Sequence, residues 1–96
     1  MITGAELISN ERNRQIEIEG YSQEHDNEHN YKEFISAAIS YLMANMIEGY
    51  EGYSKIWWPW DKDAYKPKGV IEDLTRAGAL LAAAIDRYKL QVNNKD

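Results

Sequence analysis

The sequence contains no cysteine, so it can form neither disulfide bonds nor thiolate metal sites such as zinc fingers and iron–sulfur centres. It also lacks any run of about 18 apolar residues, the length that crosses a bilayer as a helix. The first twenty residues carry too many charges for a secretory signal peptide. These absences predict a soluble cytoplasmic chain that has no membrane partner.

Basic residues are outnumbered. Eleven Lys and Arg stand against sixteen Asp and Glu, which gives a formal net charge of -5. The overall field of such a chain repels the phosphates of nucleic acids. We therefore expect no nucleic-acid partner, although a local group of cations can still attract a small anionic ligand.

Proline is rare as well, because the only two prolines, Pro59 and Pro67, both lie between apolar periodic segments. The rest of the 96 residues can be helical, and this length with 44% hydrophobic residues suits one domain over 1–96. Thr3 with Glu6, and Asn30 with Glu33, have the spacing of a capping box. The pattern predicts an all-α fold with three main helices at about 4–19, 31–48 and 70–92, the first of them capped by Gly20.

The third predicted helix carries a long apolar stripe and many small residues. The stripe consists of Val70, Leu74, Ala77, Gly78, Leu81, Ile85, Tyr88 and Val92. Small side chains allow neighbouring backbones to approach closely, so this helix is expected to pack against more than one partner helix. Three helices offer limited cover for such a surface, and we therefore expect a homo-oligomer.

The segment ERNRQ places polar residues on the inward face of the first predicted helix. Continuing the apolar stripe in helical steps leads to Glu11 and then to Arg14 or Gln15. Burying such groups unpaired costs on the order of 1–3 kcal/mol each, so they should bond one another or line a wet pocket. Arg12 and Arg14 lie on different faces, and we expect only one to point inward. The alternative is a surface helix on which Glu11 and Arg14 form an exposed ion pair.

The segment EHDNEH holds the only two histidines. On a helix, His25 and His29 would share a face near Asp26 and Glu28, a set that suits a divalent metal ion. The spacing differs from the H-E-x-x-H motif, because an aspartate follows the first histidine. The alternative is a solvated acidic turn that precedes the second helix.

The segment from 50 to 69 is rich in aromatic residues and lysines. It holds six of the eleven aromatics, and an irregular stretch of this length is usually functional or disordered. Aromatic faces beside cations suit a nucleotide-sized molecule. The alternative is a tryptophan-anchored loop that caps the core. Arg76, one turn beyond Glu72, either pairs with that glutamate or faces this segment. The candidate residues in the segment are Trp57, Trp58, Trp60, Lys66 and Lys68.

The segments ERNRQIEIEGY, EHDNEH, WPWD, KP and EDLTRAGALLAAAIDR together resemble a family of small, mostly uncharacterised proteins of bacteriophages and prophages. This resemblance runs along nearly the whole chain. The first segment is also similar, over a shorter stretch, to the opening helix of MazG-like all-α nucleotide pyrophosphohydrolases.

The MazG resemblance implies magnesium held by an E-x-x-E pair on one helix and an E-x-x-D pair on a later one. Here Glu33 is followed by Ser36 and Ala37 at the positions where the second acid belongs. On the later helix Glu72 is followed three residues on by Thr75, and Asp73 by Arg76, so neither pair is complete. The implied scaffold therefore keeps affinity for nucleotides without the ligands for hydrolysis.

We hypothesise a phage-encoded, non-catalytic protein without a cofactor that sequesters a nucleotide-derived small molecule, such as a signal of host immunity. The predicted ligand-binding residues are Arg12, Arg14, Gln15, His25, Trp57, Trp58, Trp60, Lys66, Lys68 and Arg76. One alternative is a divergent magnesium-dependent nucleoside triphosphate pyrophosphohydrolase with Glu11, Asp26, Glu33 and Asp73 as ligands. A second alternative is a protein-interaction module that docks through its aromatic segment.

Overall fold

The computed structural model describes residues 1–18, 30–46 and 51–93, and within them every regular element is helical. This confirms the predicted all-α fold. The elements are α1 (Gly4–Glu17), α3 (Tyr31–Met46), α4 (Glu51–Trp57), the short 3-10 helix η1 (Lys62–Ala64) and α5 (Val70–Asn93). None of these helices is long and apolar enough to cross a membrane.

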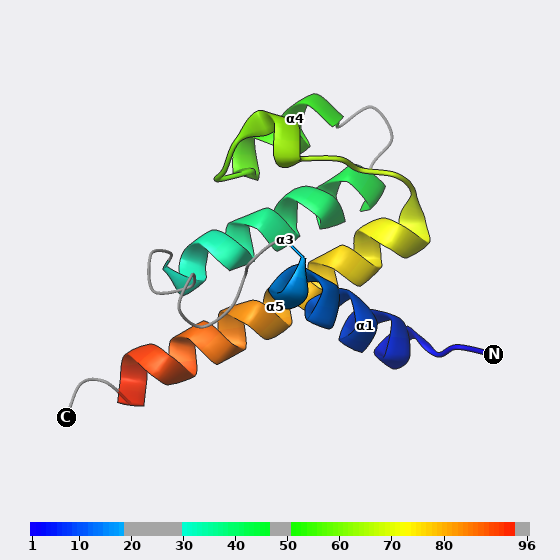
Figure 1. Cartoon of the computed structure of the whole chain (residues 1–96). Helices are drawn as coiled ribbons and strands as arrows, with labels where there is room; N and C mark the ends of the chain where they lie inside the picture. The colour runs from blue at the N-terminus through cyan, green and yellow to red at the C-terminus, as the bar shows by residue number, and fades with distance from the viewer. Residues whose placement is uncertain (19–29, 47–50, 94–96) are drawn as a thin grey trace.

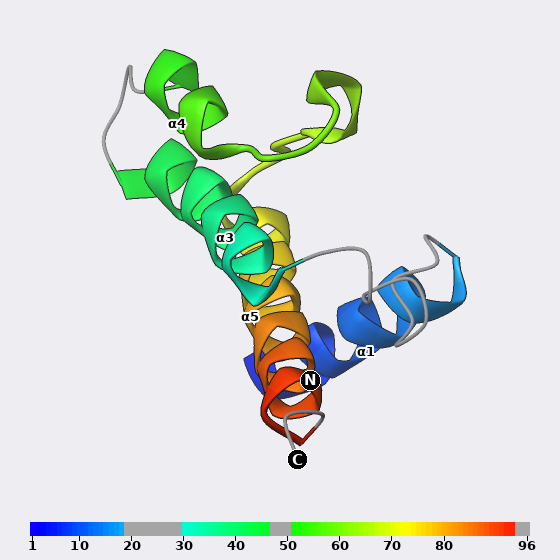
Figure 2. The ribbon, with the colours of Figure 1, turned by 90° about the vertical axis from the view of Figure 1, so that its left-hand side faces the viewer.

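The long helix α5 forms the centre of the arrangement (Figure 1). Helix α3 lies along one side of α5, and α1 packs against α5 on another side (Figure 2). Helix α4 packs on α3, which therefore lies between α4 and α5. The chain between α4 and α5 returns across this assembly to the start of α5.

Both predicted start signals cap helices. The Thr3 hydroxyl accepts a hydrogen bond from the Glu6 amide at 3.2 Å at the start of α1. At the start of α3 the Lys32 amide donates to Asn30 Oδ1 at 2.8 Å, and the Asn30 amide donates to Glu33 Oε2 at 2.8 Å. These bonds satisfy amides that a helix leaves unpaired in its first turn. At its other end α1 stops at Glu17 with Ile18 as its cap, whereas the predicted cap, Gly20, lies outside the described residues.

The core lies between α3 and α5. Its fully buried members on α3 include Phe34, Ala38 and Tyr41, and those on α5 include Ala77 and Leu80. Alanines on the α5 side let the two backbones approach closely, and the larger α3 side chains fill the space between them. This seam fixes the relative positions of the helices that surround the pocket described below.

The long stripe predicted on α5 is not the core face. Of its members only Ala77 is buried, while Leu74, Leu81, Ile85 and Tyr88 are exposed. Helix α5 instead turns a neighbouring row toward α3 that consists of Asp73, Ala77, Leu80 and Ala84. The smaller residues face inward because the α3 side chains already supply the volume of this seam.

The aromatic segment is more ordered than the sequence suggested, because it contains α4 and η1. Trp58 and Trp60 are half-buried against the core, and Tyr65 is buried in it. Trp57, at the end of α4, is 46% exposed. The segment therefore caps the core, as one of the two sequence interpretations expected, and also forms a wall of the pocket.

Candidate ligand pocket

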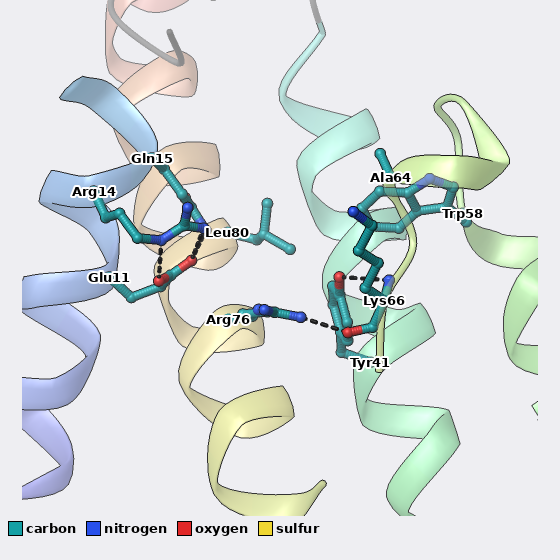
Figure 3. A pocket seen from close by; sticks show the side chains of 9 residues that line it. All are labelled: Glu11, Arg14, Gln15, Tyr41, Trp58, Ala64, Lys66, Arg76 and Leu80. Carbon is teal, nitrogen blue, oxygen red and sulfur yellow. Dashed lines mark hydrogen bonds and ion pairs between the residues drawn. The ribbon is translucent and has the colours of Figure 1, made fainter. Parts of the chain in front are cut away.

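A pocket of about 400 Å³ opens between α1, α3, α5 and the segment that precedes α5. In Figure 3 the α1 side chains lie on one side, Tyr41, Trp58, Ala64 and Lys66 lie on the other, and Arg76 and Leu80 lie between them. The nine residues that line the pocket are Glu11, Arg14, Gln15, Tyr41, Trp58, Ala64, Lys66, Arg76 and Leu80.

The α1 wall is a hydrogen-bonded polar group. Arg14 donates from Nε and Nη2 to the two carboxylate oxygens of Glu11, each at 2.7 Å, and Gln15 Nε2 donates to the same carboxylate at 3.2 Å. Gln15 is 3% exposed, and its Oε1 has no hydrogen-bond partner among the described residues. The predicted inward row is thus present and mostly paired within itself.

The carboxyl group of Glu11 is held in its charged form. Burial raises the pKa of Glu11, but the hydrogen bonds and charge of Arg14, with help from Gln15 and Arg76, outweigh this and leave the pKa below its ordinary value. Because Glu11 neutralises Arg14, the two together contribute little net charge to the pocket.

The rest of the pocket, away from α1, carries cations next to aromatic rings. Arg76 donates to the main-chain carbonyl of Lys66, and its guanidinium carbon lies 5.8 Å from the centre of the Tyr41 ring. The Lys66 amide donates to the Tyr41 hydroxyl at 3.4 Å. A guanidinium carries five N–H donors in a planar fork, a geometry that matches phosphate and carboxylate. With Glu11 paired to Arg14, Lys66 and Arg76 give the pocket its positive character.

Trp58 is held in place by its neighbours. Its indole N–H donates to the Asp61 carbonyl at 2.8 Å, and its ring lies 5.6 Å from Tyr41 and 5.2 Å from Tyr65, measured between centroids. Edge-to-face and tilted contacts at these distances are favourable. The indole is therefore oriented before any ligand arrives.

Tyr65 anchors the segment that carries Trp58 and Lys66. Its hydroxyl donates to the Ser40 carbonyl at 3.0 Å and lies 2.7 Å from Ser54 Oγ. Burial raises the pKa of Tyr65 above its ordinary value, and burial has the same effect on the pKa of Tyr41. Both phenols are therefore neutral well above pH 7.

Five of the predicted binding residues meet at this pocket, and they come from three separate segments of the sequence. They are Arg14, Gln15, Trp58, Lys66 and Arg76. The structure also answers which arginine of the first helix faces the pocket. Arg14 lines it, whereas Arg12 reaches Asp86 of α5 with a nitrogen–oxygen distance of 3.4 Å. Arg12 therefore serves the contact between α1 and α5.

The other predicted binding residues lie elsewhere. Trp57 is exposed at the end of α4, and its carbonyl accepts a bond from Ser36. Trp60 packs edge-to-face on Phe34 at 5.4 Å. Lys68 contributes its main-chain amide, which donates to Asp73 at 2.8 Å. The side chains of Trp57, Trp60 and Lys68 therefore do not line the pocket. His25 lies outside the described residues.

The acidic residues considered as metal ligands have other partners. Glu33 caps α3 and accepts a bond from the Trp60 indole at 3.1 Å. Asp73 is 2% exposed and accepts bonds from the Lys68 amide and from Asn45 Nδ2. Asp26 lies outside the described residues. Within residues 1–18, 30–46 and 51–93, no three His, Asp or Glu side chains gather closely enough to hold a metal ion.

Sequence reasoning missed three residues that line the pocket, namely Tyr41, Ala64 and Leu80. Tyr41 and Leu80 belong to apolar helical patterns that are typical of core residues, and both are indeed buried in the core. Their edges reach the pocket because α1 diverges from the α3–α5 pair. The chain matches no protein-family model, no curated protein and no solved structure, so the residues of the pocket carry the functional argument.

Proposed function

We propose that this protein binds a nucleotide-derived anionic small molecule in the pocket between α1, α3 and α5, without catalysing a reaction. The observation that carries the proposal is the joint presence of two cations, Lys66 and Arg76, and two aromatic rings, Tyr41 and Trp58, around one cavity. The two cations can pair with a phosphate group, and the two aromatic rings can stack against a planar base or an apolar sugar face.

The size of the pocket is consistent with such a ligand. Its volume of about 400 Å³ falls within the range of roughly 300–1,000 Å³ that is usual for small-molecule sites. The fixed orientation of Trp58 and Arg76 favours affinity because little side-chain freedom is lost on binding.

The environments of the acidic residues favour a binding protein over a hydrolase. Two carboxylates of the alternative metal set, Glu33 and Asp73, cap helices and hold neighbouring side chains. Glu11 is paired with Arg14. Recruiting these oxygens to magnesium would break several hydrogen bonds that stabilise the fold.

The biological role that we propose is sequestration, in the bacterial cytoplasm, of a cyclic or ADP-ribose-type nucleotide signal of host immunity. Its support is the resemblance of the sequence to phage-encoded proteins. Sequestration requires affinity alone, which agrees with a pocket that offers charge and aromatic surface.

Calorimetric titration with cyclic dinucleotides, ADP-ribose derivatives and nucleoside triphosphates tests the proposal. Two matched pairs separate the pocket from its surroundings: Trp58→Ala against Trp57→Ala, and Lys66→Ala against Lys68→Ala. We expect the first member of each pair to weaken binding about tenfold or more, a loss of about 1.4 kcal/mol, and the second to bind like the parent. If the parent binds no member of the panel, the proposal is wrong.

The same panel tests the enzymatic alternative. Incubation of the triphosphates with magnesium or manganese would yield pyrophosphate if the protein were a pyrophosphohydrolase, and a chelator would stop the release. We expect no release in any of these reactions.

A protein-interaction role has one specific observation in its favour. Ile56 is 74% exposed and Trp57 is 46% exposed, and both lie in the last turn of α4. Exposed tryptophans are frequent anchors of interfaces. Recovery of one stoichiometric host partner by the parent, and its loss in Trp57→Ala but not in Trp58→Ala, would favour this role.

A further inference from the structure

Helix α5 carries a stripe of large apolar side chains on its surface, which is interrupted once, at Gly78. Successive members are separated alternately by three and four residues, which is the heptad spacing of a helix that packs along another helix. Apart from Gly78, each member is between 41% and 71% exposed. The stripe consists of Ile71, Leu74, Gly78, Leu81, Ile85, Tyr88 and Val92.

The stripe occupies a third face of α5 that no element of the described chain covers along its length. The first face, with Ala77 and Leu80, packs on α3. The second face receives α1, to which Asp86 is joined by Arg12. Around Gly78 the edge of α1 reaches the stripe through Ile8. A helix with two packed faces and a third apolar face is typical of the centre of a larger bundle.

The second half of the stripe widens into an apolar groove of about 390 Å³ between α5 and the start of α3. Tyr31 and Ile35 of α3 form one side of the groove, and Leu81, Ile85 and Tyr88 form the other. The rings of Tyr31 and Tyr88 meet edge-to-face at 5.0 Å and close its end. The groove gives the stripe a concave surface that the large side chains of a second helix can enter.

We infer that a second copy of this chain covers the stripe, with the two α5 helices packed side by side and antiparallel around a two-fold axis. Six apolar side chains, each about half exposed, present on the order of 500 Å² per chain. Complete burial of these side chains in two copies would remove on the order of 1,000 Å² from solvent, which reaches the area that a biological interface should clear. A two-fold contact also needs one patch that complements itself, and in an antiparallel pair the groove beside the second half of each stripe faces the large side chains of the first half of the other.

The charges beside the stripe agree with a second copy. The flanking positions are Thr75, Ala77, Ala82, Ala84, Lys89 and Gln91, so one of the six is charged. In an antiparallel pair the two Lys89 side chains lie near opposite ends of the contact, and the helix dipoles oppose each other favourably.

Sedimentation equilibrium of the full chain tests the dimer. We expect a mass of twice 11.1 kDa, with Ile85→Glu reduced to 11.1 kDa while its circular dichroism stays helical. Ile56→Glu is the matched control, because it changes an isoleucine that is 74% exposed, against 61% for Ile85, and that lies away from α5. A parent that remains monomeric at about 100 micromolar overturns the dimer. If Ile56→Glu dissociates the dimer as readily as Ile85→Glu, the contact does not lie on the stripe of α5.

Introduced cysteines test the orientation, because the chain has no other thiol. With a short bismaleimide, we expect Leu81→Cys, at the middle of the stripe, to link to itself. Ile71→Cys and Val92→Cys should each stay unlinked alone and should link to each other when mixed. Linking of Ile71→Cys to itself would overturn the antiparallel arrangement, and the absence of any link in all three variants would overturn the contact between the stripes.

Discussion

Single residues decide the electrostatics of the pocket. Glu11 accepts both bonds of Arg14 and one from Gln15, which removes the charge of Arg14 from the site. Lys66 and Arg76 are then the cations that would contact the proposed anionic ligand. All of these residues are visible in the sequence. Which of the cations stay available to a ligand depends on the ion pair between Glu11 and Arg14, which are three residues apart on α1.

Acid should weaken the fold partly through Glu11. Its pKa is lower in the folded chain than in the unfolded chain, so its contribution to stability is present above the unfolded value of about 4.3 and is lost as pH falls through the folded pKa. We expect Glu11→Gln to lose less stability than the parent between pH 7 and pH 3. Urea unfolding at several pH values measures this, and parallel curves for the two proteins would contradict it.

At the scale of elements, the contact of α1 with α5 depends on the absence of a side chain at Gly78. A methyl group built there would lie 2.5 Å from Ile8 Cδ1 and 2.8 Å from Cγ1. Helix propensity favours alanine over glycine by about 1 kcal/mol, so this glycine is retained in the middle of a helix at a cost. In return, the missing side chain leaves room for Ile8, and the contact between Ile8 and Gly78 holds α1 in the position that forms the pocket wall.

We therefore expect Gly78→Ala to destabilise the parent by up to roughly 2 kcal/mol, because overpacking of about 1–3 kcal/mol exceeds the gain in helix propensity. In an Ile8→Ala background the clash is absent, and the same change should stabilise the protein by about 1 kcal/mol. Urea unfolding of the parent, Gly78→Ala, Ile8→Ala and the double variant, all at one protein concentration, gives the double-mutant cycle. Equal effects of Gly78→Ala on stability in both backgrounds would show that Ile8 does not pack against Gly78.

Also at this scale, α5 explains why the sequence misplaced a helix face. Two rows on α5 follow helical spacing: the large exposed residues, such as Leu74 and Ile85, and the smaller row of Asp73, Ala77, Leu80 and Ala84. Hydrophobicity favours the first row as the core. The second row faces inward because Phe34 and Tyr41 of α3 need alanines opposite them. The fit of two surfaces decided this, and one helix alone cannot show it.

At the scale of the whole molecule, the two proposals use different faces of α5. Arg76 and Leu80 reach the pocket, whereas Ile85 belongs to the exposed stripe. A ligand in the pocket and a second copy on the stripe can therefore bind at the same time.

Binding and association should thus be separable. We expect Ile85→Glu to be monomeric with the ligand affinity of the parent, and Lys66→Ala to be dimeric with weakened ligand binding. Calorimetry measures the ligand affinity of each variant, and sedimentation equilibrium measures its mass. Loss of ligand binding in a folded Ile85→Glu monomer would contradict the separation and would indicate that the pocket needs the second copy.

The sequence by itself determined the local structure and supplied the chemistry. Capping residues and apolar periodicity are signals within a few neighbouring residues, so the three main helices and two of their starts were predictable, whereas α4 and η1 were not. The excess of aromatic and basic residues near 50–69 was equally visible, and the proposal of an anionic, nucleotide-sized ligand rests on it.

Tertiary structure alone decided which residues meet. It selected Arg14 over Arg12 and Trp58 over Trp57 for the pocket. It also turned alanines of α5 inward and left the large apolar stripe in solvent. These choices depend on how the surfaces of α1, α3 and α5 fit together, a property of residues far apart in the chain that no local pattern contains.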